Sequence, residues 1–139
     1  MNNIKFERLT QNTLNFINDE LIMDEDKYSF YNIKKFIINE DNYIFVGIDN
    51  NKVIAMLYGY GLNRPDGKNM FYIHSVDVLK EYQGKKIGTK LMEHTLNYIK
   101  GEKRFYKFFV LTESDNIRAC KLYQKYSNRK DQVLFSNEI

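Results

Sequence analysis

A short segment with two glycines and two lysines stands where a strand pattern gives way to a helical one. The segment Gln83-Gly84-Lys85-Lys86-Ile87-Gly88 follows the strand pattern of Phe71 to Val78 and opens a helical pattern that continues to Lys100. A glycine-containing turn at a helix N-terminus presents unpaired backbone N–H groups and the positive end of the helix dipole. This arrangement favours an anion, and phosphate is its natural ligand.

The segment matches neither of two common phosphate-binding motifs. The P-loop requires G-x-x-x-x-G-K-[ST] and the dinucleotide fingerprint requires G-x-G-x-x-G, and neither spacing is found in Gln83 to Gly88. On these residues alone, two interpretations stay open. The segment is either a phosphate loop or an ordinary helix start whose lysines are solvated.

Two motifs taken together resemble those of the GNAT N-acetyltransferase superfamily. Gln83, Lys86 and Gly88 fall at the specified positions of its acyl-CoA-binding motif, [QR]-x-x-G-x-[GA], with Lys86 in place of the central glycine. The stretch from Asn116 to Lys125 is similar to the family's N-x-x-A-x-x-L-Y-x-K. Two motifs in order are more specific than either alone. A weaker similarity of the closing stretch NRKDQVLF points to small GNAT-type aminoglycoside 3-N-acetyltransferases.

The resemblance implies acetyl-CoA as co-substrate and indicates which residues hold it. The end of the preceding strand and the turn supply backbone contacts to the CoA arm and its pyrophosphate, a backbone N–H near Val78 anchors the carbonyl oxygen, and Asn116 contacts the pantetheine. From the residues alone, Asn116 is equally well a helix N-cap. The implied contacts are Val76, Val78, Gln83, Gly84, Lys85, Lys86, Ile87, Gly88, Thr89 and Asn116.

Acetyl transfer from a thioester to an amine needs an uncharged amine, an anchor for the carbonyl oxygen and a proton for the departing thiolate. The resemblance implies that Tyr123 is the acid, because the family's motif tyrosine lies near the CoA sulfur. The residues themselves allow another interpretation. Ala119, Leu122, Tyr123 and Tyr126 form an i, i+3, i+4, i+7 stripe, which predicts core packing equally well.

The candidate base lies on the strand FYIHSVDV. Strict alternation predicts that His74 shares a face with Val76 and Val78, whereas Asp77 lies on the other face. Histidine titrates near neutrality without perturbation, so His74 is the candidate base. Asp77 is its rival, and deprotonation through water or a purely structural histidine remain alternatives. His94, on the following helix, is predicted at the surface.

The elements that position these residues follow from hydrophobic periodicity and turn composition. Asp49 to Lys52 and Arg64 to Gly67 predict turns between antiparallel strands, and the acidic run Asp24 to Asp26 predicts a loop or helix start. The order β-α-α-β-β-β-α-β-α-β predicts an α/β (α+β) fold, with a mixed, mostly antiparallel sheet and helices on both faces. Strands are expected at 4–9, 43–48, 53–62, 71–78, 108–112 and 132–136, and helices at 10–18, 28–39, 86–100 and 116–126.

Composition limits the function classes. The 139 residues predict one domain, 1–139, and 43% hydrophobic residues suffice for a folded core. Lys and Arg number 21 against 18 Asp and Glu, a net charge of +3 that argues against nucleic-acid binding. The single cysteine, Cys120, excludes an intramolecular disulfide and a multi-thiolate metal site, which fits a reducing cytoplasm. No apolar run approaches the roughly 20 residues that span a bilayer, so no membrane partner is expected.

These observations favour an acetyl-CoA-dependent N-acetyltransferase that acts on the primary amine of a small molecule, an aminoglycoside-like one among the candidates, by direct attack in a ternary complex. The alternative is a GNAT-fold protein that binds CoA without turnover, as a sensor or partner subunit. The acceptor amine is not identified by the sequence. The oligomeric state is not fixed either, and a homodimer stays open.

Overall fold

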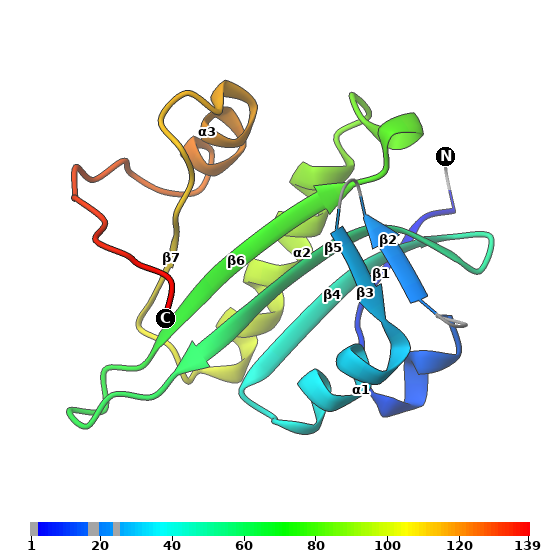
Figure 1. Cartoon of the computed structure of the whole chain (residues 1–139), viewed down its shortest axis with the longest axis horizontal. Coiled ribbons are helices and arrows are strands. Elements are labelled where there is room, and N and C mark those ends of the chain that lie inside the picture. Colours follow the sequence, from blue (N-terminus) through cyan, green and yellow to red (C-terminus); the bar gives the residue numbers. More distant parts are fainter. Residues whose placement is uncertain (1–2, 17–19, 24–25) are drawn as a thin grey trace.

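The protein folds around one five-stranded sheet whose strands follow the order β1-β4-β5-β6-β7 (Figure 1). The computed structural model describes residues 3–16, 20–23 and 26–139. Neighbouring strands are antiparallel except β6 and β7, which are parallel. The elements are β1 (Lys5–Arg8), the 3-10 helix η1 (Gln11–Phe16), β2 (Glu20–Met23), β3 (Asp26–Ser29), α1 (Phe30–Ile38), β4 (Asn42–Asp49), β5 (Lys52–Leu62), β6 (Met70–Val78), the 3-10 helix η2 (Lys80–Tyr82), α2 (Ile87–Glu102), β7 (Lys107–Val110) and α3 (Ile117–Gln124).

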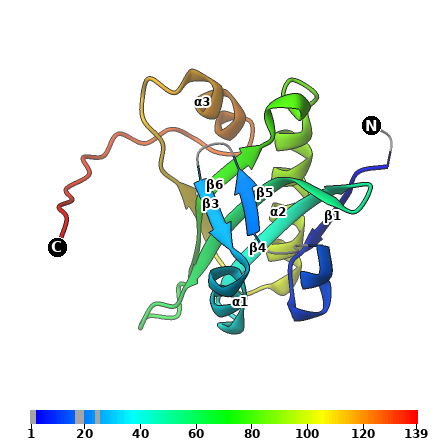
Figure 2. The same cartoon turned by 45° about the vertical axis from the view of Figure 1, so that its right-hand side comes forward.

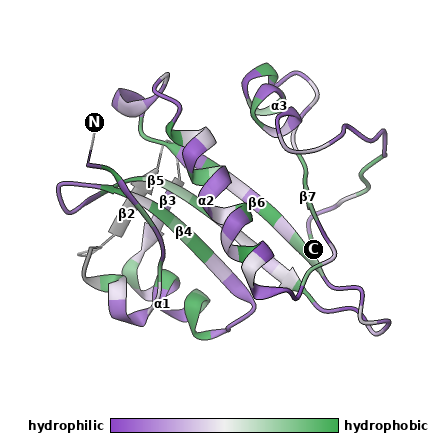
Figure 3. Ribbon diagram, turned by 180° about the vertical axis from the view of Figure 1, so that it is seen from behind, coloured by the Kyte–Doolittle hydropathy of each residue, from purple (hydrophilic) through white to green (hydrophobic). Residues whose placement is uncertain are grey.

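Helices cover both faces of the sheet, as the sequence predicts. Alternation along β4 sends Val46 to the face covered by α1 and Phe45 to the face covered by α2, and both side chains are fully buried. Figure 3 shows α2 lying across the sheet when the molecule is viewed from behind. In the described part of the chain, no helix has the length and apolarity that crossing a bilayer requires.

The hairpin between β4 and β5 confirms its turn signal. Asp49 pairs with Lys52, and the two residues between them, Asn50 and Asn51, have φ angles of 49° and 63°. Two consecutive left-handed residues form the turn that matches the right-handed twist of a hairpin, and asparagine tolerates that conformation better than most residues. The turn starts the pairing of β4 with β5, and the register shifts once, between Gly47 and Ile48, before β5 reaches its aromatic residues.

The N-terminal third differs from its prediction. The expected helix at 10–18 is a 3-10 helix over Gln11–Phe16, and its last two residues lie outside the described part. In the acidic run, Asp24 and Glu25 also lie outside it, but Asp26 begins β3, which pairs with β2 in a separate two-stranded sheet. The prediction of a loop or helix start is therefore wrong at Asp26. The helical periodicity of residues 28–39 hid a strand that ends at Ser29, whose side chain caps α1 by accepting from the Asn32 N–H at 3.1 Å.

The predicted strand at 132–136 is also wrong. No strand is assigned beyond α3, and the apolar side chains of Val133, Leu134 and Phe135 are 78%, 73% and 89% exposed. Figure 2 shows this segment running away from the body of the molecule. A strand forms only against a partner edge, which local periodicity does not supply.

Candidate active site

Strands β6 and β7 separate halfway along β6. Their pairing runs from Met70, opposite Lys107, to Ile73, opposite Val110, and ends there, although β6 continues to Val78. Figure 1 shows the two strands diverging toward α3. Because the other edge of β6 is paired with β5 as far as Val78, the backbone groups of Val76 and Val78 that face away from β5 have no strand opposite them in the described chain. An extended ligand arm can hydrogen-bond to such an edge as a strand would.

The turn after β6 presents a group of backbone N–H donors. The first hydrogen bond of α2 runs from the Lys90 N–H to the Lys86 carbonyl at 3.0 Å, so the N–H groups of Ile87, Gly88 and Thr89 have no acceptor inside the helix. Gly84 has φ +79°, and a Cβ placed there would meet no atom within 4 Å. The approach to these donors is open, and the positive end of the helix dipole adds to their attraction for an anion.

Cationic side chains surround this turn. Lys85 and Lys86 extend from the turn itself and are exposed. Arg118 and Lys125 come from α3 and its C-terminal end: the Arg118 Nη1 donates to the Gln83 Oε1 at 2.7 Å, and the Lys125 Nζ donates to the Thr89 Oγ1 at 2.9 Å. A pyrophosphate fits this set of charges and N–H donors better than a neutral ligand does.

Tyr123 projects from α3 into the same region. Its neighbour Leu122 lies 3.7 Å from the Cβ position of Gly88, which packs α3 against the start of α2. Burial, together with the nearby Asp77 carboxylate, raises the pKa of Tyr123 to about 12. Among the described residues, the Ser127 hydroxyl donates a hydrogen bond to the backbone carbonyl of Tyr123, and none is found at the Tyr123 side-chain hydroxyl. Tyr123 is therefore protonated at neutral pH and can donate its proton to a ligand atom.

A β-bulge corrects the predicted faces of β6. Tyr58 pairs with Ser75 and Gly59 pairs with Ile73, so His74 is an extra residue without a register partner. Beyond the bulge the phase is reversed. Val76 and Val78 pack in the core on the α2 side, whereas Asp77 lies opposite Met56 on the α1 side.

The bulge brings the two candidate bases to one face. The His74 ring stacks on the Tyr58 ring on the α1 side, with centroids 4.9 Å apart, and is exposed. Asp77 lies on that same side and accepts a hydrogen bond from the Ser75 hydroxyl at 2.8 Å. The prediction that His74 and Asp77 lie on opposite faces is therefore wrong, because strict alternation takes no account of a bulge.

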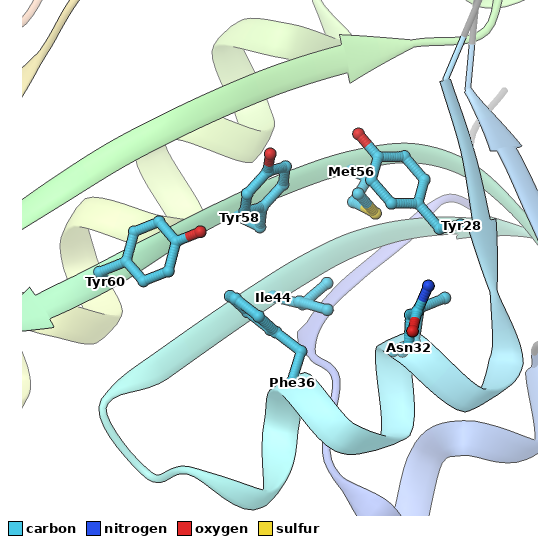
Figure 4. A pocket seen from close by; sticks show the side chains of 8 residues that line it. Tyr28, Asn32, Phe36, Ile44, Met56, Tyr58 and Tyr60 are labelled. Atoms are coloured by element: carbon cyan, nitrogen blue, oxygen red, sulfur yellow. The ribbon is translucent and has the colours of Figure 1, made fainter. Parts of the chain in front are cut away.

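A pocket opens on that face, between α1 and the sheet (Figure 4). Its volume is about 210 Å³. Phe36 and Asn32 rise from α1, and Tyr28 reaches in from β3, opposite the side chains of β4 and β5. The lining residues are Tyr28, Asn32, Ile33, Phe36, Ile44, Met56, Tyr58 and Tyr60. Since His74 stacks on Tyr58, its imidazole borders this pocket.

Residues 10–127 match the sequence profile of the Acetyltransferase (GNAT) family. The chain belongs to this family. The match spans both motifs, so the resemblance predicted from the sequence is confirmed. Among curated proteins, no sequence matches the chain significantly.

Solved structures share the GNAT fold over nearly the whole chain. An aminoglycoside acetyltransferase from an uncultured soil metagenomic sample, in complex with trehalose, is 25% identical, with 99% of this chain and 97% of that one aligned and a TM-score of 0.77. A second soil metagenomic aminoglycoside acetyltransferase is 16% identical over 98% of both chains, with a TM-score of 0.79. A ribosomal-protein-alanine N-acetyltransferase from Brucella melitensis biovar Abortus 2308 is 12% identical over 98% of this chain and 99% of that one, with a TM-score of 0.74.

The departure of this GNAT chain at Lys86 has a structural account. Lys86 is the N-cap of α2 and has φ 62° and ψ 22°, a left-handed conformation that glycine adopts without strain. The lysine therefore keeps the backbone path that the family's glycine position requires, at a cost of roughly 1–2 kcal/mol. Its side chain makes no capping hydrogen bond.

Two of the motif's polar side chains have structural partners. The Gln83 amide donates to the Val78 carbonyl at 2.9 Å and accepts from Arg118, so it ties the end of β6 to α3. The Asn116 Oδ1 accepts from the Ala119 N–H at 3.1 Å, which is the N-cap interpretation. The backbone N–H groups of the turn therefore remain the principal candidates for CoA in this GNAT domain, and the contact of Asn116 with pantetheine stays a prediction.

Other residues of the GNAT domain differ from the sequence analysis. His94 is not a surface residue: it is half-buried beside Phe6 and Phe45, and burial lowers its pKa. Sequence reasoning also missed Arg118 and the aromatic pocket. Arg118 lies inside the second motif, so its type and place were a usable signal, whereas no local pattern joins pocket residues from β3, α1, β4 and β5.

Proposed function

We propose that the protein transfers the acetyl group of acetyl-CoA to a primary amine of a small molecule by direct attack in a ternary complex. One observation carries this proposal. The open N–H donors of the α2 turn, the buried hydroxyl of Tyr123 and the exposed imidazole of His74 all gather around the unpaired half of β6. The similarity to aminoglycoside acetyltransferases supports an amine acceptor.

In this proposal the turn holds the CoA. The N–H groups of Ile87, Gly88 and Thr89 bind the pyrophosphate, and the edge of β6 at Val76 and Val78 binds the pantetheine arm. Acetyl-CoA supplies the acetyl carbon: the amine nitrogen bonds to it, the carbon–sulfur bond breaks, and the sulfur keeps the electron pair. A backbone N–H near Val78 donates to the carbonyl oxygen as charge develops on it.

Two side chains handle the protons. His74 takes one proton from the attacking amine, which must be uncharged to use its lone pair. Tyr123 donates to the sulfur. A thiol has a pKa near ~8.5, and the pKa of Tyr123 without a bound ligand is about 12. With these pKa values, complete proton transfer from the Tyr123 hydroxyl to the CoA thiolate would be unfavourable. Its first contribution is therefore a hydrogen bond that stabilises the departing thiolate, with the proton following as the sulfur's charge develops.

The test is thiol release from acetyl-CoA, with mass spectrometry of the acetylated product, across a panel of amines. Tyr123→Phe is expected to lower kcat by about a hundredfold, within the usual range for losing a proton donor, and to leave the calorimetric affinity for CoA within about twofold. Tyr106→Phe is the matched control, because Tyr106 is 54% exposed beside β7. CoA binding without thiol release for any amine would instead identify a non-catalytic sensor or partner protein.

We also propose that the protein is a homodimer. β7 is an edge strand, and the segment after α3 holds the exposed apolar side chains of Val133, Leu134 and Phe135. In a dimer, this segment of one copy can pair with the β7 edge of the other copy, because every chain carries both an open edge and an unpaired strand-forming segment. Sedimentation analysis should give a dimer for the full chain and a monomer for Phe135→Asp. A full chain that stays monomeric at micromolar concentration would contradict the proposal.

A further inference from the structure

The pocket between α1 and the sheet is lined mainly by apolar and aromatic side chains. None of the eight described lining residues carries a charge; their polar side-chain groups are the Asn32 amide and the hydroxyls of Tyr28, Tyr58 and Tyr60. An aminoglycoside carries several ammonium and hydroxyl groups, and each would lose hydration here without a charged partner in the wall. The lining therefore suits an apolar body better than a polycationic sugar.

The size of the pocket sets a second limit. Its volume is about 210 Å³, and an apolar cavity of about 150 Å³ is large enough to hold benzene. One six-membered ring with a short side arm fits the space. A second linked ring would have to lie outside it.

The walls present ring faces and edges. On β5, Tyr58 and Tyr60 line the pocket; the Phe36 ring from α1 meets them edge-on, with centroid distances of 5.8 and 5.5 Å. Tyr28 meets Tyr58 edge-on at 6.1 Å. Aromatic rings prefer offset-stacked and edge-to-face neighbours, and tyrosine faces also attract cations. An aromatic ring inserted here finds both kinds of neighbour.

Groups that can accept a proton lie next to the pocket, beyond its apolar wall. The His74 ring is 4.9 Å from Tyr58 and 6.0 Å from Tyr60. Asp77 is the register partner of Met56, another lining residue. A molecule whose ring occupies the pocket would place an amine on a short arm beside these groups, on the side where β6 carries its unpaired edge.

From this arrangement we propose that the acceptor is an arylalkylamine, a primary amine on a short chain attached to a single aromatic ring. The assignment rests on the proposed acetyl transfer. The uncharged amine bonds to the acetyl carbon through its nitrogen lone pair, and the nitrogen then gives one proton to His74. The carbon–sulfur bond breaks with its electron pair passing to the sulfur, which takes a proton from Tyr123. The product is a neutral amide, and its aromatic ring stays in the pocket until the product dissociates.

Calorimetry on the free protein tests the pocket without relying on turnover. The probes are 2-phenylethylamine, its non-aromatic counterpart 2-cyclohexylethylamine, and the aminoglycoside sisomicin. 2-Phenylethylamine is expected to bind between about twofold and tenfold more tightly than 2-cyclohexylethylamine, which is the advantage of aromatic contacts over area alone. Sisomicin is expected to bind at least about tenfold more weakly, because its ammonium groups find no carboxylate among the described lining residues.

A pair of variants on α1 localises the binding. Asn32→Trp fills the pocket from an exposed helix position and is expected to weaken binding of 2-phenylethylamine at least tenfold, roughly the loss of one good aromatic contact. Tyr31→Leu is the matched control on the same helix: Tyr31 is 71% exposed and does not line the pocket, so binding should not change. Circular dichroism and thermal melts show whether both variants fold.

Thiol release with the same three amines separates this inference from the proposed function. Acetylation of 2-phenylethylamine with a kcat/KM at least tenfold above that for sisomicin supports both. Acetylation that favours sisomicin overturns the arylalkylamine assignment and leaves the acetyltransferase intact. Binding of 2-phenylethylamine that Asn32→Trp does not weaken overturns the pocket as its site. No thiol release with any amine overturns the proposed function, while tight binding of 2-phenylethylamine would still support the pocket.

Discussion

The two halves of the candidate site are built from different materials. The proposed CoA side, around the α2 turn, consists mainly of backbone N–H groups and an unpaired strand edge. The acceptor side consists of aromatic side chains that β3, α1 and β5 bring together. Backbone groups are the same in every sequence, so this region can keep its ligand while residues vary. Side chains are not, so the acceptor region is where a change of residue changes the ligand.

The largest expected effect comes from a substitution on the acceptor side that lowers kcat and leaves binding of acetyl-CoA unchanged. His74→Asn keeps a polar side chain of similar size but removes the base, and is expected to lower kcat by about a hundredfold. The KM for acetyl-CoA should change little, because the CoA side is backbone. Steady-state kinetics with each substrate varied in turn checks this. A larger loss of kcat in Asp77→Asn than in His74→Asn would assign the base to Asp77.

A change in the backbone of the α2 turn should instead lower the affinity for CoA. Lys86→Pro replaces a residue with φ 62° by one locked near −65°, so the turn cannot form and calorimetric CoA affinity should fall at least tenfold. Lys103→Pro is the matched control, because Lys103 has φ 57° at the other end of the same helix. Both variants should lose stability in denaturant titrations. Equal loss of CoA affinity in both would show that the effect comes from the helix, and would remove the special role of the turn.

The pH dependence of folding can be separated from that of catalysis through His94. Burial lowers the pKa of His94 in the folded state below the unfolded value of about 6.5. The unfolded chain therefore takes up a proton first, so this contribution to stability is full above about pH 6.5 and is lost as the pH falls. His94→Leu should reduce the loss of unfolding free energy between pH 7.5 and 5.5 by less than about 1 kcal/mol, since the ring is only partly buried. Urea titrations at the two pH values measure it; an unchanged difference would contradict the burial effect.

The smallest effect is expected where the residue changes and the backbone does not. Lys86→Gly relieves roughly 1–2 kcal/mol of left-handed strain but adds roughly 0.5–1 kcal/mol of unfolded-state entropy, so the net gain in stability should be between about 0 and about 1.5 kcal/mol. CoA affinity should stay within about twofold. Lys103→Gly should gain a similar amount without touching the turn. A tenfold loss of CoA affinity in Lys86→Gly would show that the lysine side chain itself binds the cofactor.

The sequence predicts more of the proposed CoA side than of the acceptor side, because the CoA side is a local turn and the acceptor side joins side chains from distant elements. The turn at Gln83 to Gly88 is local, so its glycines and its place before a helix indicate an anion site as one of two interpretations, and the second motif at Asn116 to Lys125 favours it. The faces of β6 were not predictable, because the extra residue at His74 is revealed only by its pairing with β5. β3 was hidden because its last two residues merge into the helical pattern predicted for 28–39, while Asp26 belongs to an acidic run that predicts a loop or helix start. The segment after α3 was predicted as a strand because its side chains suit one, but no strand edge of the described fold pairs with it.

The bulge in β6 also determines where the strand can tolerate the insertion or deletion of a residue. His74 is the one residue of β6 that pairs with nothing on β5, so a chain lacking it would join Ile73 directly to Ser75 and restore regular alternation. Val76 and Val78 would still point into the core and Asp77 would still point away from it. The candidate base is thus carried by a residue that can be inserted or deleted without shifting the register of the strand around it. A lineage of such proteins can gain or lose this imidazole in one step while the CoA turn keeps its place.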